Sequence, residues 1–416
     1  MNAYEIIEKA EKELVDSGVF KRVEEIAFFN QKKVMDAFRK FRVSESYFAA
    51  SSGYGYNDRG RDELEKIYAE VFECEAALVR QTLTSGTHTL ATGLFGLLRP
   101  GDTLLSVTGK PYDTLEEVIG IRGEEGNGSL RDFGIKYAQI EMKDGTVDTQ
   151  AVSEYLKKDK SVKVVFLQRS KGYSVRKTLS SKEIGDIVKF VKDINKDVFV
   201  AVDNCYGEFC DEHEPTYYGA DLIMGSLIKN PGGGMAETGG YLAGTARAVE
   251  LCAYRHTCPG IGAEGGATLG QNKNMYKGLF YAPHTVCQSI KTALLASKVY
   301  ENLGYETYPK ATDERHCIIQ TISLKTREKL LDFCCGIQSG SPVDSYVAPV
   351  PYAMPGYADE VIMAAGAFTQ GSSIELSADA PCKEPYTVYL QGGLTYESGK
   401  IGVMYAVMGT EKISEK

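Results

Sequence analysis

Three groups of polar residues follow apolar segments of this sequence, and their types suit one kind of chemistry. Lys229 ends the stretch GSLIK and is followed by Asn, Pro and three glycines. Asp203 comes directly after VFVAV, and residues 85–87, Ser-Gly-Thr, follow ALVRQTLT where a helical pattern begins. A lysine in a dry pocket can form an imine with an aldehyde, and the glycines after it would leave room for the imine to move.

The other two groups would complete a site for an aldehyde that carries a ring nitrogen and a phosphate. A carboxylate such as Asp203 can keep a ring nitrogen protonated. Free N–H groups at the start of a helix, together with hydroxyls, favour a phosphate. These are the needs of pyridoxal 5'-phosphate, which we predict as the cofactor. The predicted contacts to it are Lys229, Asp203, Ser85, Gly86 and Thr87.

Alternating strands and helices must position these residues. Short β-branched runs alternate with segments of helical spacing from about residue 78, which is typical of a mostly parallel sheet covered on both faces. The predicted strands are 76–80, 102–107, 136–140, 162–167, 197–202, 220–226 and 239–244. The predicted helices include 62–72, 89–98, 149–158, 181–194 and 286–304. Ligands of such sheets bind at the carboxyl ends of the strands, where Asp203, Ser226 and Lys229 fall.

The chain of 416 residues is long enough for two domains, and we expect an α/β fold. We predict a helical arm over residues 1–60, a large cofactor-binding domain over 61–300 and a small α/β domain over 301–416.

Composition excludes several classes of function. A net charge of −9 argues against nucleic-acid binding, and the sequence has no apolar run long enough for a membrane span. The N-terminal stretch is charged and lacks the apolar core of a signal peptide, so we expect a cytoplasmic protein. The ten cysteines form no CxxC pair, which favours reduced thiols over disulfides and predicts no metal site.

Several longer stretches resemble one enzyme family. They are GYGYNDRGRDELEKIYAEVF, SGTHTLATGLFGLLRPGD, FLQRSKGYSVRKTL, AVDNCYGEF, GADLIMGSLIKNPGGG, FTQGSSIELSADAP and PYTVYLQGGLTY. Together they resemble the fold-type I pyridoxal-phosphate enzymes of cysteine and methionine metabolism. The sequence is most similar to the methionine gamma-lyase-like, cystathionine beta-lyase-related branch that is linked by name to aluminium resistance.

The resemblance implies a fold like that of aspartate aminotransferase, with a seven-stranded sheet, and a role for each matching residue. Lys229 matches the Schiff-base lysine and Asp203 the partner of the pyridine nitrogen. Ser226 matches a phosphate-binding hydroxyl. Tyr112 resembles the aromatic residue that stacks on the ring and assists proton transfer. The activity implied is elimination from a sulfur-containing amino acid, which gives a thiol, ammonia and a 2-oxo acid.

The resemblance also implies shared active sites. Tyr56 and Arg59 resemble a tyrosine and an arginine that reach the phosphate of a neighbouring subunit, with Arg61 as the alternative arginine. We therefore expect a homo-oligomer, specifically a homotetramer built as a dimer of dimers.

One departure from the family concerns the substrate carboxylate. Related enzymes hold it with an arginine of the small domain, whereas this sequence has no arginine after Arg327. We expect Arg169 to replace it because this residue follows the apolar strand VVFL, with Arg176 as the alternative. Gln391, from the region where the family arginine would lie, is a further candidate.

Other functions fit parts of the sequence. Aldol cleavage or transamination on the same fold, or cofactor binding without lyase activity, are the alternatives. Ser226 and Lys229 also spell the S-x-x-K motif of serine acyl-transfer enzymes. That motif requires its serine at the start of a helix and partner motifs S-D-N and K-T-G, neither of which occurs.

Overall fold

A seven-stranded sheet organises the first two thirds of the chain in the computed structural model, which describes residues 1–353 and 359–416. The strand order is β1-β9-β8-β7-β6-β2-β3, and only β9 runs against its neighbours. The strands are β1 (Ala76–Arg80), β2 (Thr103–Ser106), β3 (Lys136–Gln139), β6 (Val162–Gln168), β7 (Phe199–Asp203), β8 (Leu222–Ser226) and β9 (Gly240–Gly244). All seven predicted strands form, and the prediction of a mostly parallel sheet is confirmed.

Helices cover both faces of this sheet because its strands are apolar on both faces. Val164 and Phe166 of β6 pack in one core, whereas the alternate residues Val165 and Leu167 pack in the other. This is the two-residue period expected of a strand buried on both sides. The surrounding helices are α3 (Arg59–Val71), α4 (Gly86–Leu97), α5 (Asp113–Ile119), α6 (Thr149–Lys158), α7 (Ser181–Ile194) and α8 (Ala246–His256).

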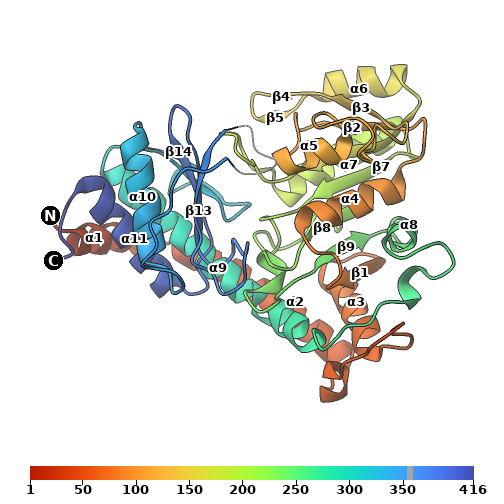
Figure 1. The fold of residues 1–416 in the computed structure, drawn as a ribbon, viewed down its shortest axis with the longest axis horizontal. Helices are drawn as coiled ribbons and strands as arrows, with labels where there is room; N and C mark the ends of the chain where they lie inside the picture. The colour runs from red at the N-terminus through yellow and green to blue at the C-terminus, as the bar shows by residue number, and fades with distance from the viewer. Residues whose placement is uncertain (354–358) are drawn as a thin grey trace.

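A second, antiparallel sheet lies in the last quarter of the chain. Its order is β10-β11-β14-β13-β12, and α10 (Arg327–Ser339) and α11 (Tyr396–Glu411) pack beside it (Figure 1). The strands are β10 (Glu306–Tyr308), β11 (Gln320–Ser323), β12 (Val361–Ala364), β13 (Ser377–Pro381) and β14 (Thr387–Gln391). A short hairpin of β4 (Met142–Lys143) and β5 (Thr146–Val147) forms a third sheet.

One long helix, α9 (Asn272–Asn302), connects the two larger sheets (Figure 1). The sequence predicts this helix only from residue 286, because Gly278 and Pro283 would normally interrupt it. The structure continues the helix through both residues. Met275, Tyr276 and Leu279 are buried in this first part, so tertiary packing outweighs the weak helix propensity.

The N-terminal helices α1 (Ala3–Ser17) and α2 (Val19–Lys40) pack against other helices of the same chain, including α9, and α1 also packs against α11. Lys400 of α11 forms ion pairs with Glu8 and Glu11 of α1. The two chain ends therefore lie close together at one end of the molecule (Figure 1). The boundaries of the arm and of the two domains stay a prediction.

Within the described residues, the structure contains no helix that is both long and apolar enough to cross a membrane.

Packing of α1 can be tested with a single core substitution. Ile7 is fully buried, whereas Val15 of the same helix is 58% exposed. Ile7→Ala should lower the free energy of unfolding by about 2–4 kcal/mol, because it leaves a cavity that neighbouring side chains cannot fill. Val15→Ala should change it by less than about 0.5 kcal/mol. Urea unfolding measures both, and equal effects would contradict this packing.

Candidate active site

A cavity of about 280 Å³ lies at the carboxyl edge of the large sheet, between that sheet and the small one. It is lined by residues that the sequence singles out and by residues of the small sheet. The lining residues from the first part of the chain are Gly86, Thr87, Leu90, Tyr112, Thr114, Leu115, Asp203, Cys205, Tyr206 and Lys229. The structure brings six of the predicted site residues together around one space, because Gln391 of the small sheet joins Gly86, Thr87, Tyr112, Asp203 and Lys229.

Lys229 and Asp203 are placed by adjacent parallel strands. Asp203 ends β7, and Lys229 follows three residues after the end of β8, where η2 (Asn230–Gly232) begins. The Lys229 Nζ lies 4.2 Å from the centre of the Tyr206 ring. Burial alone would lower the pKa of Lys229, but the Asp203 carboxylate and other nearby groups act against it and raise it.

Asp203 is almost completely buried, and its surroundings suit a positively charged partner. Its Oδ1 accepts a hydrogen bond from the Cys205 N–H at 3.1 Å. Burial raises the pKa of Asp203, while Lys229 and Arg176 oppose that rise. A protonated ring nitrogen in the cavity would have the same effect as these cations, because an opposite charge favours the carboxylate form.

The N-terminus of α4 opens beside the lysine and carries the groups that a phosphate needs. Ser85 is its N-cap, and no acidic residue lies in the first turn. Thr87 Oγ1 lies 2.7 Å from Thr114 Oγ1. A Cβ at Gly86 would lie 3.6 Å from the Ser226 Cβ and 3.9 Å from the Lys229 Nζ, so a side chain here would narrow the space next to the lysine. The residues present therefore fit pyridoxal phosphate.

Tyr112 lies between this cavity and a second one of about 460 Å³, because it lines both. It is the N-cap residue of α5, and its N–H donates to the Gln168 Oε1 at 2.7 Å. Its ring packs edge-on against Tyr173, with centroids 5.7 Å apart. Stacking on the cofactor ring stays a prediction for this residue.

The glycines after Lys229 have a different role from the one that the sequence indicates. A Cβ at Gly233 would lie 2.5 Å from the Gly278 carbonyl oxygen of α9, and one at Gly232 would overlap the Leu227 carbonyl. Gly233 also has a φ of 53°, which favours glycine. These residues let the chain pack closely against α9, and Gly86 is the glycine that leaves space beside the lysine.

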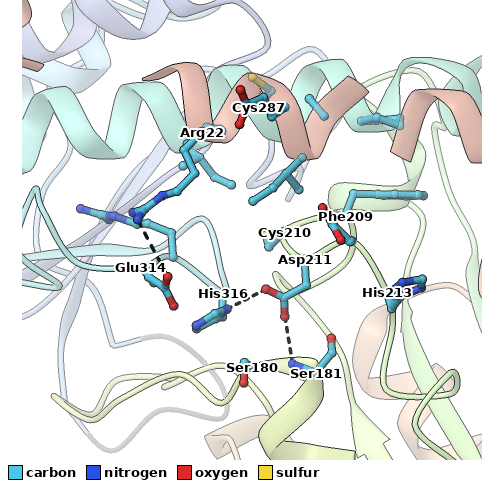
Figure 2. A pocket seen from close by; sticks show the side chains of 18 of the residues that line it. Arg22, Ser180, Ser181, Phe209, Cys210, Asp211, His213, Cys287, Glu314 and His316 are labelled. Atoms are coloured by element: carbon cyan, nitrogen blue, oxygen red, sulfur yellow. Dashed lines mark hydrogen bonds and ion pairs between the residues drawn. The ribbon is translucent and has the colours of Figure 1, made fainter. Parts of the chain in front are cut away.

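Arg169 does not lie where a substrate carboxylate could reach it, and this prediction is corrected. Its side chain is fully buried on the far side of the β7 turn, where Nη2 donates to Asp211 at 2.7 Å and Nη1 contacts Glu214 at 3.1 Å. Asp211 also accepts from the His316 ring and from the Ser181 N–H (Figure 2). Arg169 is thus one member of an internal ion network.

Arg176, the alternative arginine, lines the cavity next to the predicted cofactor site. It lines the 460 Å³ cavity together with Lys171, and no carboxylate among the described residues forms an ion pair with either cation. Its Nη2 donates to the carbonyls of Gln168 and Ser170. Burial lowers the pKa of Arg176 to about 10, which still leaves it charged at neutral pH.

The residues expected to serve a neighbouring subunit lie on the surface. Tyr56 is 52% exposed, and Arg59 is exposed at the start of α3 with Nη2 donating to the Tyr47 hydroxyl. Arg61 is buried and donates to the carbonyls of Gly55, Gly266 and Glu264. Arg61 therefore holds the loop in place, whereas Arg59 is exposed, and its role toward a second subunit stays a prediction.

The small sheet supplies four cavity residues on one face: Met363 of β12, Ser377 and Asp379 of β13, and Gln391 of β14. Gln391 uses its amide nitrogen on Ser377 Oγ at 3.0 Å and on Asp379 Oδ2 at 3.1 Å. The sequence-based interpretation missed Asp379, as well as Cys205 and Tyr206. The latter two could have been found because they follow Asp203 by two and three residues.

Ser226 is fully buried at the end of β8 and does not begin a helix. Its Oγ accepts from the Ile228 N–H at 3.3 Å. The arrangement lacks the geometry of a serine acyl-transfer site. The Ser226 Cβ would lie 3.6 Å from a Cβ at Gly86, and the phosphate role of Ser226 stays a prediction.

Comparison with known proteins agrees with this arrangement. Residues 3–411 match the methionine gamma-lyase family. The chain belongs to the methionine gamma-lyase family. The protein YnbB of Bacillus subtilis is 52% identical over 392 residues, which cover 94% of this chain and 93% of that protein.

Solved structures are similar over nearly the whole chain. A carbon–sulfur lyase involved in aluminium resistance from Clostridium novyi is 51% identical with a TM-score of 0.93, over 97% of this chain and 95% of that one. A candidate cystathionine beta-lyase involved in aluminium resistance from Listeria innocua is 49% identical with a TM-score of 0.95, over 99% and 100% of the two chains. The predictions of fold type I, of a carbon–sulfur lyase and of pyridoxal phosphate are confirmed at the level of the family.

The structural role of Arg169 can be separated from a binding role. Arg169→Met would leave Asp211 and Glu214 without their buried counter-charge, so it should lower the free energy of unfolding by about 3–5 kcal/mol. Arg22→Met, which removes an exposed ion pair with Glu314, should cost less than about 1 kcal/mol. Urea unfolding measures the change in the free energy of unfolding for both variants. A stable Arg169→Met protein with a raised KM would restore the original prediction.

Proposed function

We propose that this protein cleaves the carbon–sulfur bond of a sulfur-containing amino acid by elimination and releases a thiol, ammonia and a 2-oxo acid. The supporting observation is that Lys229, Asp203 and the N-terminus of α4 line one cavity, as a covalently bound pyridoxal phosphate requires. When bound, this cofactor supplies an electron-withdrawing ring that stabilises negative charge at the substrate Cα.

The residues of the chain have separate roles in the proposed reaction. Lys229 would take the α-proton as a neutral amine. This requires the substrate amine to displace the lysine from the cofactor aldehyde, which releases the lysine in its neutral form although its surroundings raise its pKa. Asp203 holds a positive charge on the ring nitrogen. The first-turn N–H groups of α4 and the hydroxyls of Ser226 and Thr87 hold the phosphate. Tyr112, which lines the cavity at the start of α5, would cover the ring and restrict water.

Arg176 is our proposal for the residue that binds the substrate carboxylate. It is charged, lies within electrostatic range of Asp203 and lines the cavity that Tyr112 shares with the cofactor site. A guanidinium provides paired donors for a carboxylate. Both side chains already donate within the protein, but Gln391 is the weaker candidate because its amide carries no charge.

We further propose a cytoplasmic homotetramer in which Arg59 and Tyr56 complete the phosphate site of a neighbouring subunit. Both side chains are exposed at the surface of the single chain. All ten cysteines are free, which suits a reducing compartment.

Loss of the lysine tests the whole proposal. Lys229→Ala should show no visible imine absorption and no cofactor fixed by borohydride, and its turnover should fall by at least about 1,000-fold. Lys163→Ala, outside the cavity, serves as the control. The assay supplies cystathionine, cysteine and methionine and measures thiol and 2-oxo acid. Wild-type protein that stays colourless after incubation with the cofactor would refute the proposal.

The carboxylate role of Arg176 has its own test. Arg176→Gln should raise KM by about 10- to 100-fold, because a charge-assisted pair contributes roughly 1.5–3 kcal/mol. The visible imine absorption should persist, since Arg176 lies outside the cofactor cavity. Arg131→Gln, on the surface, is the control. An unchanged KM in a folded variant would assign the carboxylate to another residue.

A further inference from the structure

Asp379 is a carboxylate in the cofactor cavity that the proposed mechanism does not use. It lies on β13, where it pairs in register with Tyr389 of β14, and Ser377 pairs with Gln391. Since alternate residues of a strand share a face, these side chains project from one face of the small sheet. Ser377, Asp379 and Gln391 line the cavity that also contains Lys229.

The contacts of Asp379 fix its position without neutralising its charge. The Gln391 amide donates to Oδ2 at 3.1 Å, and the Tyr173 hydroxyl is a second hydrogen-bonding neighbour. No lysine or arginine among the described residues forms an ion pair with Asp379, although Lys229 acts on it at longer range. Hydrogen bonds from these two neutral groups hold the side chain in place.

The charge balance of the cavity favours a protonated Asp379. Lys229 is the only lysine or arginine among the described residues that line it, and the Asp203 carboxylate lies in the same space. Burial raises the pKa of Asp379 above its ordinary value and outweighs the hydrogen bonds from Gln391 and Tyr173 and the charge of Lys229, which act in the opposite direction. A carboxyl group that keeps its proton inside a substrate cavity can donate it to a group on which negative charge develops.

We propose that Asp379 is the acid that protonates the sulfur atom as it leaves the substrate. The proposal depends on the carbon–sulfur lyase function stated above. The carbon–sulfur bond breaks with both electrons going to sulfur, and the Asp379 proton adds to sulfur to give a neutral thiol. For sulfur on Cβ, the α-proton goes to Lys229 and its electron pair becomes the second bond between Cα and Cβ. The Asp379 carboxylate then regains a proton from water.

Substrates with different leaving groups test this role. S-Methylcysteine needs a proton on its poor leaving group, whereas β-chloroalanine releases chloride without one. Asp379→Asn holoenzyme should lose about 100- to 10,000-fold in kcat on S-methylcysteine and less than about 5-fold on β-chloroalanine. Asp379→Glu should recover part of the loss because it restores an acid. Asp332→Asn, in a surface ion pair with Lys412, is the matched control.

The rates of Asp379→Asn on the two substrates can contradict the proposal in two ways. Equal losses on both substrates would make Asp379 a positioning residue and overturn the proposal, as would an unchanged rate on S-methylcysteine. Solvent-isotope washout of the substrate α-proton should persist in Asp379→Asn, since that step belongs to Lys229. Wild-type protein that acts on neither substrate would contradict the lyase function itself.

A spectroscopic measurement decides the protonation state independently of turnover. The infrared difference between wild-type protein and Asp379→Asn should contain the carbonyl stretch of a protonated carboxyl at pH 7. The titratable groups that face Asp379 are Lys229, Tyr206, Tyr173 and Cys334 of α10. Absence of this band at pH 7, in protein with an unchanged cofactor spectrum, would overturn the proposal even if the enzyme has no known substrate.

Discussion

The buried guanidinium of Arg169 determines the shape of the turn that follows Asp203. It contacts Asn204, Asp211 and Glu214, all of which lie in the segment after β7. A Cβ at Gly207 would lie 2.4 Å from the Arg169 Cδ, so the backbone passes directly over this side chain. A buried charge that loses its partners is costly, and the turn is therefore held in one conformation. Asp203, Cys205 and Tyr206 enter the cavity from that fixed turn.

The large sheet and the central pair of the site could be predicted because both depend on local patterns. Apolar strands that end in a polar residue indicate the carboxyl edge of a parallel sheet, and this placed Asp203 and Lys229 correctly in one cavity. For Arg169, the same pattern did not indicate the direction in which the side chain points. Neighbouring residues at a strand end point to opposite faces. Gln168 reaches the Tyr112 N–H on the cavity side, so Arg169 points into the core.

The contribution of the small sheet could not be predicted in the same way. Asp379 reaches the cavity only because β13 pairs with β14 in one antiparallel register, and a shift by one residue would turn it to the opposite face. Similarly, the role of Gly233 depends on the position of α9, a helix whose first part the sequence does not indicate. Both features result from contacts between distant segments of the chain.

The packing of α1 has a consequence for the order of events on the ribosome. This helix is translated before α11, one of the helices that it packs against. Ile6, Ile7 and Leu14 must therefore remain without some of their final neighbours until α11 has been made. Exposed apolar faces of nascent chains promote aggregation, so maturation of this protein should depend on chaperones that protect the segment until α11 can pack against it.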